Sequence, residues 1–272
     1  MKMIVALVCI FTCVGCMKLK FLKAYNGWNG RPTIVEELTY NVQTDEGKFQ
    51  EEFGIKEVYV FDRKGRLLKM TTYGSDTAKA KKWETYQYDK SGNIVQRKYF
   101  KKDSSSDFQI DYTYNRYGQI VREETIQPYG RETATYSYDR DSFTAVSQRI
   151  NEIGNTKWRS IEQFDASWKK IYSNTYNESG GLSSKWEFVY DDKGRQIVAK
   201  WYNPELYYIY HSVYDKYGSA IKVEMCRIEK GNTSSCTTTT YRHEYDNKNN
   251  CIVDTLSADE KPLFIYRYRF TY

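Results

Sequence analysis

The sequence contains few residues with the chemistry of catalysis or metal binding. His211 and His243 are the only histidines, and the six cysteines include no Cys-x-x-Cys spacing. The chain also lacks a glycine-rich phosphate loop, a Gly-x-Ser-x-Gly turn and a His-Glu-x-x-His helix motif. The sequence therefore predicts a protein that is not an enzyme, with no catalytic residue, no metal site and no cofactor.

Two cysteines have a spacing that suits a disulfide. Cys226 and Cys236 are equidistant from Gly231, at the centre of a turn over residues 228–233. They should face each other across one hairpin and, in an oxidising compartment, form a disulfide that contributes about 2 to 3 kcal/mol. The alternative is a pair of free cysteines in neighbouring strands, because spacing alone does not fix connectivity.

The N-terminus predicts export and lipid attachment. Met1-Lys2 precedes an apolar run from Met3 to Gly15, which has the length of a signal-peptide core and is too short to span a bilayer. The run ends in Cys13-Val14-Gly15-Cys16, which resembles a bacterial lipobox, although that pattern usually has Leu where Cys13 stands. We expect a signal peptide over residues 1–15, lipidation of Cys16 and a tether over residues 16–32. An ordinary signal peptide with an incidental cysteine is the alternative.

The charge distribution bears on location and partners. The net charge of +6 is spread along the chain, and the cluster Lys98–Lys102 is typical of a hairpin tip, so no nucleic-acid partner is expected. The lipidated end would place the protein on the outer membrane. Lys18 and Lys20 follow the lipobox where comparable surface lipoproteins carry an acidic run, which favours an anchor that faces the periplasm.

Four tryptophans are the candidate ligand-binding residues. Trp83, Trp158, Trp186 and Trp201 lie next to expected turns between repeats, and indole rings can stack on sugar faces. The competing interpretation is that they fill the core, as large aromatic residues usually do. A solvent-facing row of tryptophans would favour glycan binding.

An aromatic residue followed by Asp or Asn recurs about every 26 residues, at eight places. Another ring often stands two positions earlier, Gly often follows three positions after the acid, and an apolar residue always follows six positions after it. The pairs are Phe61-Asp62, Tyr88-Asp89, Tyr114-Asn115, Tyr138-Asp139, Phe164-Asp165, Tyr190-Asp191, Tyr214-Asp215 and Tyr245-Asp246.

Each repeat has the features of a β-hairpin. Two rings separated by one residue lie on the same face of a strand, and the acid then starts a turn that Gly can close with positive φ. Ser142 and Trp168 replace this Gly in two copies, which predicts wider or irregular turns there. His243 stands two positions before Tyr245 and is interpreted as a replaced tyrosine.

These units resemble the YD (RHS) repeat of bacterial surface and toxin-associated proteins. Tyr86–Val95, Tyr112–Gln119 and Phe188–Arg195 carry the resemblance, which extends over roughly Tyr59 to Tyr272, with Ile34 to Phe53 as a diverged opening hairpin. A short lipobox protein built of such units is similar to uncharacterised lipoproteins of Bacteroidetes type. The resemblance implies a fold and a compartment but no activity.

The expected fold is all-β, with one domain over residues 33–272. About eight tandem hairpins give about sixteen antiparallel strands in a meander. Accumulated twist should curl this sheet over its aromatic face or close it into a barrel. A solenoid-like body held by contacts between neighbours is favoured over an outer-membrane barrel, because strands such as Gln96-Arg97-Lys98 carry charge on both faces.

Two functions follow from these features. The first is a non-catalytic, lipid-anchored scaffold that docks another envelope protein. The second is a module that binds a glycan or another ligand through exposed Tyr and Trp residues.

Overall fold

The computed structural model describes residues 32–45, 48–75, 79–103, 105–151, 156–229, 232–258 and 261–272. In these residues all regular structure is β, with eighteen strands and no helix. The predicted signal peptide over residues 1–15, the lipidation site Cys16 and the tether up to residue 31 lie outside the described residues.

The strands follow one another along the chain without a long interruption. Their bounds are β1 Ile34–Asp45, β2 Lys48–Phe61, β3 Leu67–Tyr73, β4 Ala80–Tyr88, β5 Ile94–Lys101, β6 Ser106–Tyr114, β7 Ile120–Gln127, β8 Gly130–Asp139, β9 Thr144–Asn151, β10 Thr156–Phe164, β11 Lys170–Asn177, β12 Leu182–Tyr190, β13 Gln196–Tyr202, β14 Tyr207–Tyr214, β15 Ala220–Glu229, β16 Asn232–Tyr245, β17 Cys251–Ala258 and β18 Lys261–Thr271.

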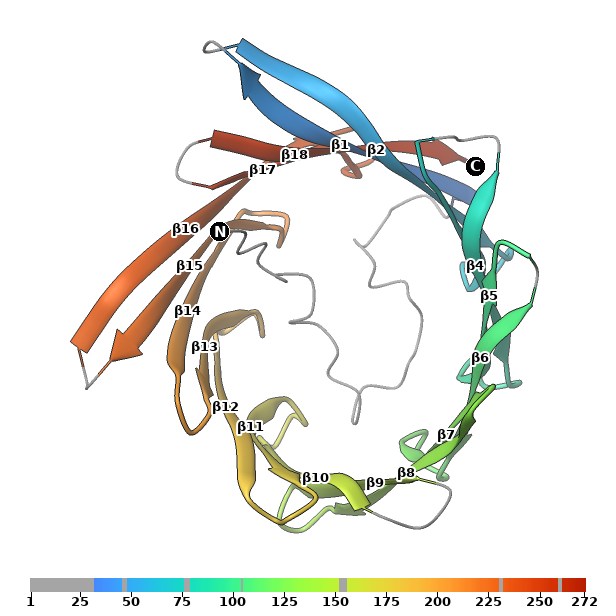
Figure 1. Ribbon diagram of the computed structural model, residues 1–272, viewed down its shortest axis with the longest axis vertical. Helices are drawn as coiled ribbons and strands as arrows, with labels where there is room; N and C mark the ends of the chain where they lie inside the picture. Colours follow the sequence, from blue (N-terminus) through green and yellow to red (C-terminus); the bar gives the residue numbers. More distant parts are fainter. Residues whose placement is uncertain are drawn as a thin grey trace.

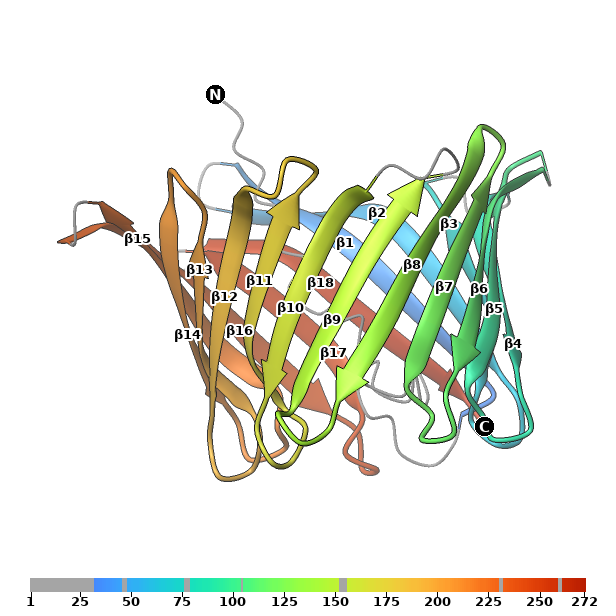
Figure 2. The same cartoon turned by 90° about the horizontal axis from the view of Figure 1, so that it is seen from below.

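The sheet closes into a barrel. Each strand pairs antiparallel with its neighbours in sequence, and β1 also pairs with β18, from Ile34 opposite Thr271 to Asn41 opposite Phe264. Figure 1 shows the resulting ring of strands, and Figure 2 shows that the strands are tilted relative to its axis. The all-β antiparallel meander is therefore confirmed, with eighteen strands instead of about sixteen. Of the predicted shapes the structure has the closed barrel, and an open curled sheet or solenoid is wrong because the first and last strands pair.

The hairpin turns that follow the aromatic–acid pairs share one backbone geometry. In the β4–β5 turn, the N–H of Asp89 donates to the carbonyl oxygen of Asn93, and the N–H of Gly92 donates to that of Asp89. The carboxylate of Asp89 accepts the N–H of Asn93, and Gly92 has a φ of 85°. The same pair of backbone bonds occurs in the turns that begin at Asp62, Asn115, Asp165, Asp191, Asp215 and Asp246.

The two turns in which Ser142 and Trp168 replace glycine behave differently. Trp168 takes a φ of 60° and donates its N–H to the carbonyl oxygen of Asp165, so this turn keeps the common geometry and the predicted irregularity is wrong. The turn after Asp139 is irregular, as predicted. There Phe143 has the positive φ, of 51°, and the strand pairing runs up to Asp139 opposite Thr144.

Tyrosines of the aromatic–acid pairs hold each hairpin to the preceding one. The hydroxyl of Tyr88, at the end of β4, donates at 2.7 Å to the carbonyl oxygen of Leu67, at the start of the neighbouring strand β3. Four further tyrosines make the equivalent bond to a carbonyl oxygen of the preceding hairpin. They are Tyr114 to Ile94, Tyr138 to Ile120, Tyr190 to Lys170 and Tyr214 to Gln196. His243, interpreted as a replaced tyrosine, places Nε2 at 2.8 Å from the carbonyl oxygen of Ala220.

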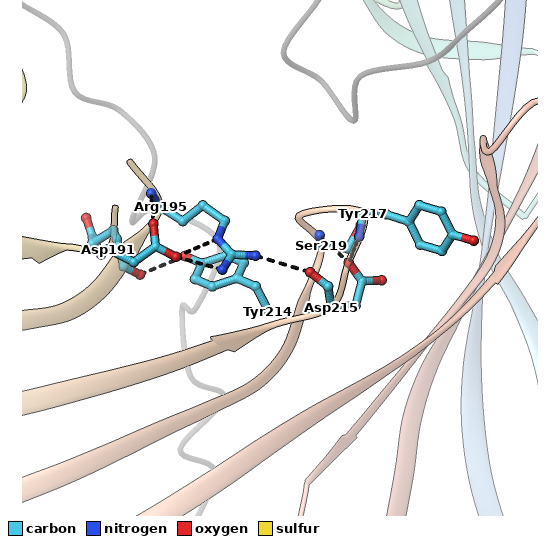
Figure 3. A network of polar contacts seen from close by, with 7 residues as sticks. Asp191, Arg195, Tyr214, Asp215, Tyr217 and Ser219 are labelled. Carbon is cyan, nitrogen blue, oxygen red and sulfur yellow. Dashed lines mark hydrogen bonds and ion pairs between the residues drawn. The ribbon is translucent and has the colours of Figure 1, made fainter. Parts of the chain in front are cut away.

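Neighbouring turns also contact each other through charged side chains, as Figure 3 shows for two of them. The guanidinium of Arg195 donates to the carboxylate of Asp191 at 2.7 Å and to the carbonyl oxygen of Asp215 at 3.1 Å, and it lies over the ring of Tyr214. The backbone N–H of Arg195, together with its guanidinium, holds the pKa of Asp191 below its usual range. The acids thus serve the turns, as the repeat pattern predicts.

The two faces of the sheet differ in burial. In β8, Ala134 and Tyr136 are buried, whereas the alternating residues Thr135 and Ser137 are exposed. The strand registers join these buried positions into one face that continues around the barrel. Side chains converge on the concave face of a closed sheet, so we place this more buried face inside the barrel and call it the inner face. Its core cluster is Val35, Tyr59, Phe61, Leu67, Tyr86, Ile94, Tyr112, Ile120, Ala134 and Tyr136.

Candidate ligand-binding wall

Five aromatic rings gather on the inner face of three adjacent strands. Trp186 lies opposite Trp201 in the β12–β13 register, and Trp201 lies opposite Tyr208 in the β13–β14 register. Phe188 and Tyr210 lie two positions further along β12 and β14, on the same face. We call Trp186, Phe188, Trp201, Tyr208 and Tyr210 the aromatic wall.

The rings of the aromatic wall form one continuous surface. The centroid of Trp186 is 6.2 Å from that of Trp201 and 6.0 Å from that of Tyr210, and Trp201 and Tyr208 are 5.7 Å apart. The rings of Trp186 and Phe188 are nearly parallel, with an angle of 2° between their planes. All five side chains are half-buried, so part of each ring is open to solvent. This is neither the fully exposed row nor the dry core that the sequence left as alternatives.

The surroundings of the aromatic wall are neutral and hydroxyl-bearing. In register on the inner face, Ser173 lies opposite Trp186 and Thr175 lies opposite Ser184. Ala199 lies opposite both Phe188 and Tyr210, and it is only 1% exposed. Among the described inner-face residues of β12 to β14, none carries a charge at neutral pH, and Lys170 at the start of β11 is paired with Glu162 of β10. Such a surface suits a ligand with apolar faces and hydroxyl groups.

The other two candidate tryptophans lie apart from this wall. Trp83 is on the opposite, outer face of the sheet, stacked on Phe100 with a centroid distance of 5.4 Å. Trp158 lies on the inner face of β10, where the guanidinium of Arg149 is 5.5 Å from its ring centroid. The structure therefore brings together two of the four tryptophans. It adds Phe188, Tyr208 and Tyr210, which the period-two alternation along β12 and β14 could have identified.

A second stretch of the inner face is charged. Glu84 pairs with Arg97 at 3.1 Å, and Glu123 pairs with Arg149 at 2.8 Å. The guanidinium of Arg97 also lies 5.1 Å from the ring centroid of Tyr99. Because each arginine is matched by a carboxylate, these pairs hold neighbouring strands together and leave the aromatic wall as the uncharged part of the interior.

A contact between Cys251 and His243 invites a comparison with nucleophilic catalysis. The Sγ of Cys251 lies 3.9 Å from Nδ1 of His243, which is 3.4 Å from Oδ1 of Asp254. Burial raises the pKa of the Cys251 thiol to about 12, so the thiol stays protonated at neutral pH. This arrangement therefore does not supply a nucleophile. In the described residues, no group of three or more His, Cys, Asp or Glu side chains could hold a metal ion.

The disulfide predicted between Cys226 and Cys236 is confirmed. The two residues are directly opposite in the β15–β16 register, with their Cα atoms 4.1 Å apart. Cys251 is a free cysteine. Within the described part of the chain there are also no helices with the length and apolar character needed to cross a membrane.

No protein-family model matches the chain, and no curated protein matches its sequence. The resemblance to YD repeats therefore stays a prediction.

Three solved structures are similar to the chain over most of its length. A porin-like protein from Bacteroides uniformis is 12% identical, covers 88% of this chain and 97% of its own, and has a TM-score of 0.47. A putative AttH from Nitrosomonas europaea is 9% identical over 94% of this chain and 98% of its own, with a TM-score of 0.16. The immune modulator A of Aeromonas veronii is 8% identical over 92% and 100%, also with a TM-score of 0.16. Identities and TM-scores this low assign no function.

Proposed function

We propose that this protein is a non-catalytic binding protein of the bacterial cell envelope, which holds a glycan against the aromatic wall inside its barrel. The observation that carries the proposal is the cluster of Trp186, Trp201, Tyr208 and Tyr210 on an uncharged stretch of the inner face. Aromatic faces pack against the C–H faces of sugar rings, and neighbouring hydroxyl groups exchange hydrogen bonds with sugar hydroxyls.

The width of the barrel supports a ligand inside it. Side chains fill the interior of barrels with about eight strands, whereas barrels with about sixteen to eighteen strands enclose a water-filled space. This barrel has eighteen strands and therefore belongs to the wide class that encloses a water-filled space. A half-buried ring on its inner face is then available to a solute that enters the lumen.

The proposed location is the periplasmic face of the outer membrane, with a lipid on Cys16 as the anchor. The outer face of the barrel supports an aqueous environment, because it carries ion pairs such as Lys185–Glu187 at 2.7 Å and Arg131–Glu124 at 2.8 Å. In this arrangement the membrane contacts the acyl chain, and the strands stay in water.

The experiment that tests this proposal measures the binding of neutral oligosaccharides to the mature chain by tryptophan fluorescence and by calorimetry. Replacing both Trp186 and Trp201 by Ala should weaken binding at least about tenfold, since each stacked ring contributes on the order of 1 kcal/mol. Trp83→Ala is the matched control, because Trp83 lies on the outer face, and it should leave the affinity unchanged. Equal loss in both variants, or no binding of any neutral glycan, would contradict the proposal.

A scaffold that docks another envelope protein is the second candidate. Two hairpins favour it, because their outer parts extend past their neighbours. In the described residues, Lys48–Phe53 of β2 and Asn232–Thr238 of β16 each pair with a strand on one side only. Unpaired strand edges can accept a partner strand. Cross-linking of the tagged protein in cells should then capture a reproducible envelope protein, and the Cys16→Ser variant should lose it.

A further inference from the structure

The closure between the first and last strands carries a group of carboxyl side chains on the inner face. Glu37 of β1 lies directly opposite Glu57 of β2, and on its other side it lies opposite Tyr268 of β18. Asp254 of β17 is near enough to act on Glu37 electrostatically. We call these strands, β1, β2, β17 and β18, the seam.

One hydroxyl group serves both glutamates. The Tyr59 oxygen is 2.6 Å from Oε2 of Glu57 and 3.4 Å from Oε2 of Glu37. Because a hydroxyl carries one proton, it can donate to only one of two carboxylates at a time. Glu57 has the shorter bond and also accepts the hydroxyl of Thr72 at 3.1 Å, so Glu57 has more hydrogen-bond donors than Glu37.

Within the described residues no Lys or Arg side chain forms an ion pair with Glu37 or Glu57, whereas Asp254 lies 3.4 Å from Nδ1 of His243. The nearby basic side chains lie on the outer face of the same strands, where Lys56 pairs with Glu36 and Arg267 pairs with Glu51. The titratable groups that face Glu37 from the packed strands are Glu57 and Tyr59 of β2, Asp254 of β17, Tyr266 and Tyr268 of β18 and, beyond Asp254, His243 of β16.

We infer that the seam is a proton-responsive closure of the barrel, in which a neutral Glu37 holds β1 against β2 and β18 and an ionised Glu37 loosens them. In the neutral state the opposed pair carries at most one negative charge, and Glu57 accepts the hydroxyls of Tyr59 and Thr72. In the ionised state two half-buried carboxylates face each other and share the hydroxyl of Tyr59 as a donor.

The electrostatics agree with this geometry. Burial, with the neighbouring carboxylate of Glu57 adding to it, raises the pKa of Glu37 from 4.5 to about 7. The native protein therefore keeps a proton that the unfolded chain releases at lower pH. The contribution of Glu37 to the free energy of unfolding therefore falls as the pH rises from about 4.5 to about 7, and it is constant above that.

Hydrogen exchange and thermal unfolding of the full chain at about pH 5 and about pH 8 test this inference. The amides that join β1 to β18 should lose protection about tenfold or more at the higher pH, after correction for intrinsic exchange. Amides of the β6–β7 hairpin, which is far from the seam, should change less.

Two variants make the test specific. Glu37→Gln removes the titrating group but keeps its shape, so the pH dependence of β1–β18 protection should disappear. Glu36→Gln is the matched control, because Glu36 is the neighbouring residue on the outer face, and it should keep the wild-type pH dependence. A wild-type seam with equal protection at both pH values would overturn the inference, even if Glu37→Gln failed to fold. Glycan binding at the aromatic wall is a separate readout and is not needed for this result.

Discussion

At the scale of single residues, the turns depend on a few positions with left-handed backbone. Gly92 has a φ of 85°, and a Cβ added there would meet no atom within 4 Å. Its conformational freedom, and not the space around it, is therefore what the turn uses. Asn249 takes the same place in the last turn with a φ of 61°, and Trp168 does so with 60°. The turn geometry is thus strong enough to impose a strained φ on a bulky residue.

Gly92→Ala should lower the free energy of unfolding by about 1 kcal/mol, because alanine resists a left-handed backbone and no clash adds to this cost. Gly92→Asn should cost less, since asparagine tolerates this conformation. Urea unfolding measures both. Ser91→Ala in the same turn is the control, and a loss for Gly92→Ala no larger than for this control would contradict the explanation.

At the scale of elements, the β15–β16 hairpin combines a long free edge with a covalent cross-link. Asn232–Thr238 pairs only with β15 in the described residues, so the outer part of this hairpin lacks support from β17. The disulfide between Cys226 and Cys236 joins the two strands at this level. It therefore stabilises a part of the barrel in which β16 has a neighbouring strand on one side only.

Replacing Cys226 and Cys236 together by Ser should lower the free energy of unfolding by about 2 to 3 kcal/mol, as expected for a cross-link that closes a loop of about ten residues. Protease cleavage near the hairpin tip should become faster. A reductant should destabilise the wild-type protein by a similar amount and leave the double variant unchanged. If the reductant affects both proteins equally, the effect comes from another site.

At the scale of the whole molecule, the barrel and the proposed lipid anchor have separate roles. The outer face carries paired charges, including the two bonds by which the Arg267 guanidinium holds Glu51, at 2.5 and 2.9 Å. A surface of this kind is compatible with water, so attachment to a membrane should depend on the acyl chain alone.

Cys16→Ser should therefore move the protein from the detergent phase to the aqueous phase in a detergent phase-separation experiment on cell extracts. The wild-type protein, once labelled with a radioactive fatty acid, should stay in the detergent phase. Retention of the variant in the detergent phase would mean that the barrel itself, or an ordinary uncleaved signal peptide, makes the membrane contact.

The sequence alone determined the features that depend on neighbouring residues. Alternating side chains identify strands, and the acid and glycine of each repeat identify turns, because both signals act over a few residues. The facing pair Cys226 and Cys236 was predictable for the same reason, since a single hairpin turn sets its register. The turn at Trp168 was not, because the local signal of glycine is missing there while the flanking strands still impose its geometry.

Only the tertiary structure decided that the sheet closes and which rings and carboxyl groups meet. Closure joins residues as far apart as Thr33 and Thr271, which are separated by 238 positions, and it depends on the sum of the twists of all eighteen strands. Small differences in each strand decide whether that sum brings β18 to β1. The contact between Glu37 and Tyr268 depends on this sum. The face that the closed sheet makes concave decides that Trp186 and Trp201 lie inside the barrel and that Trp83 lies outside.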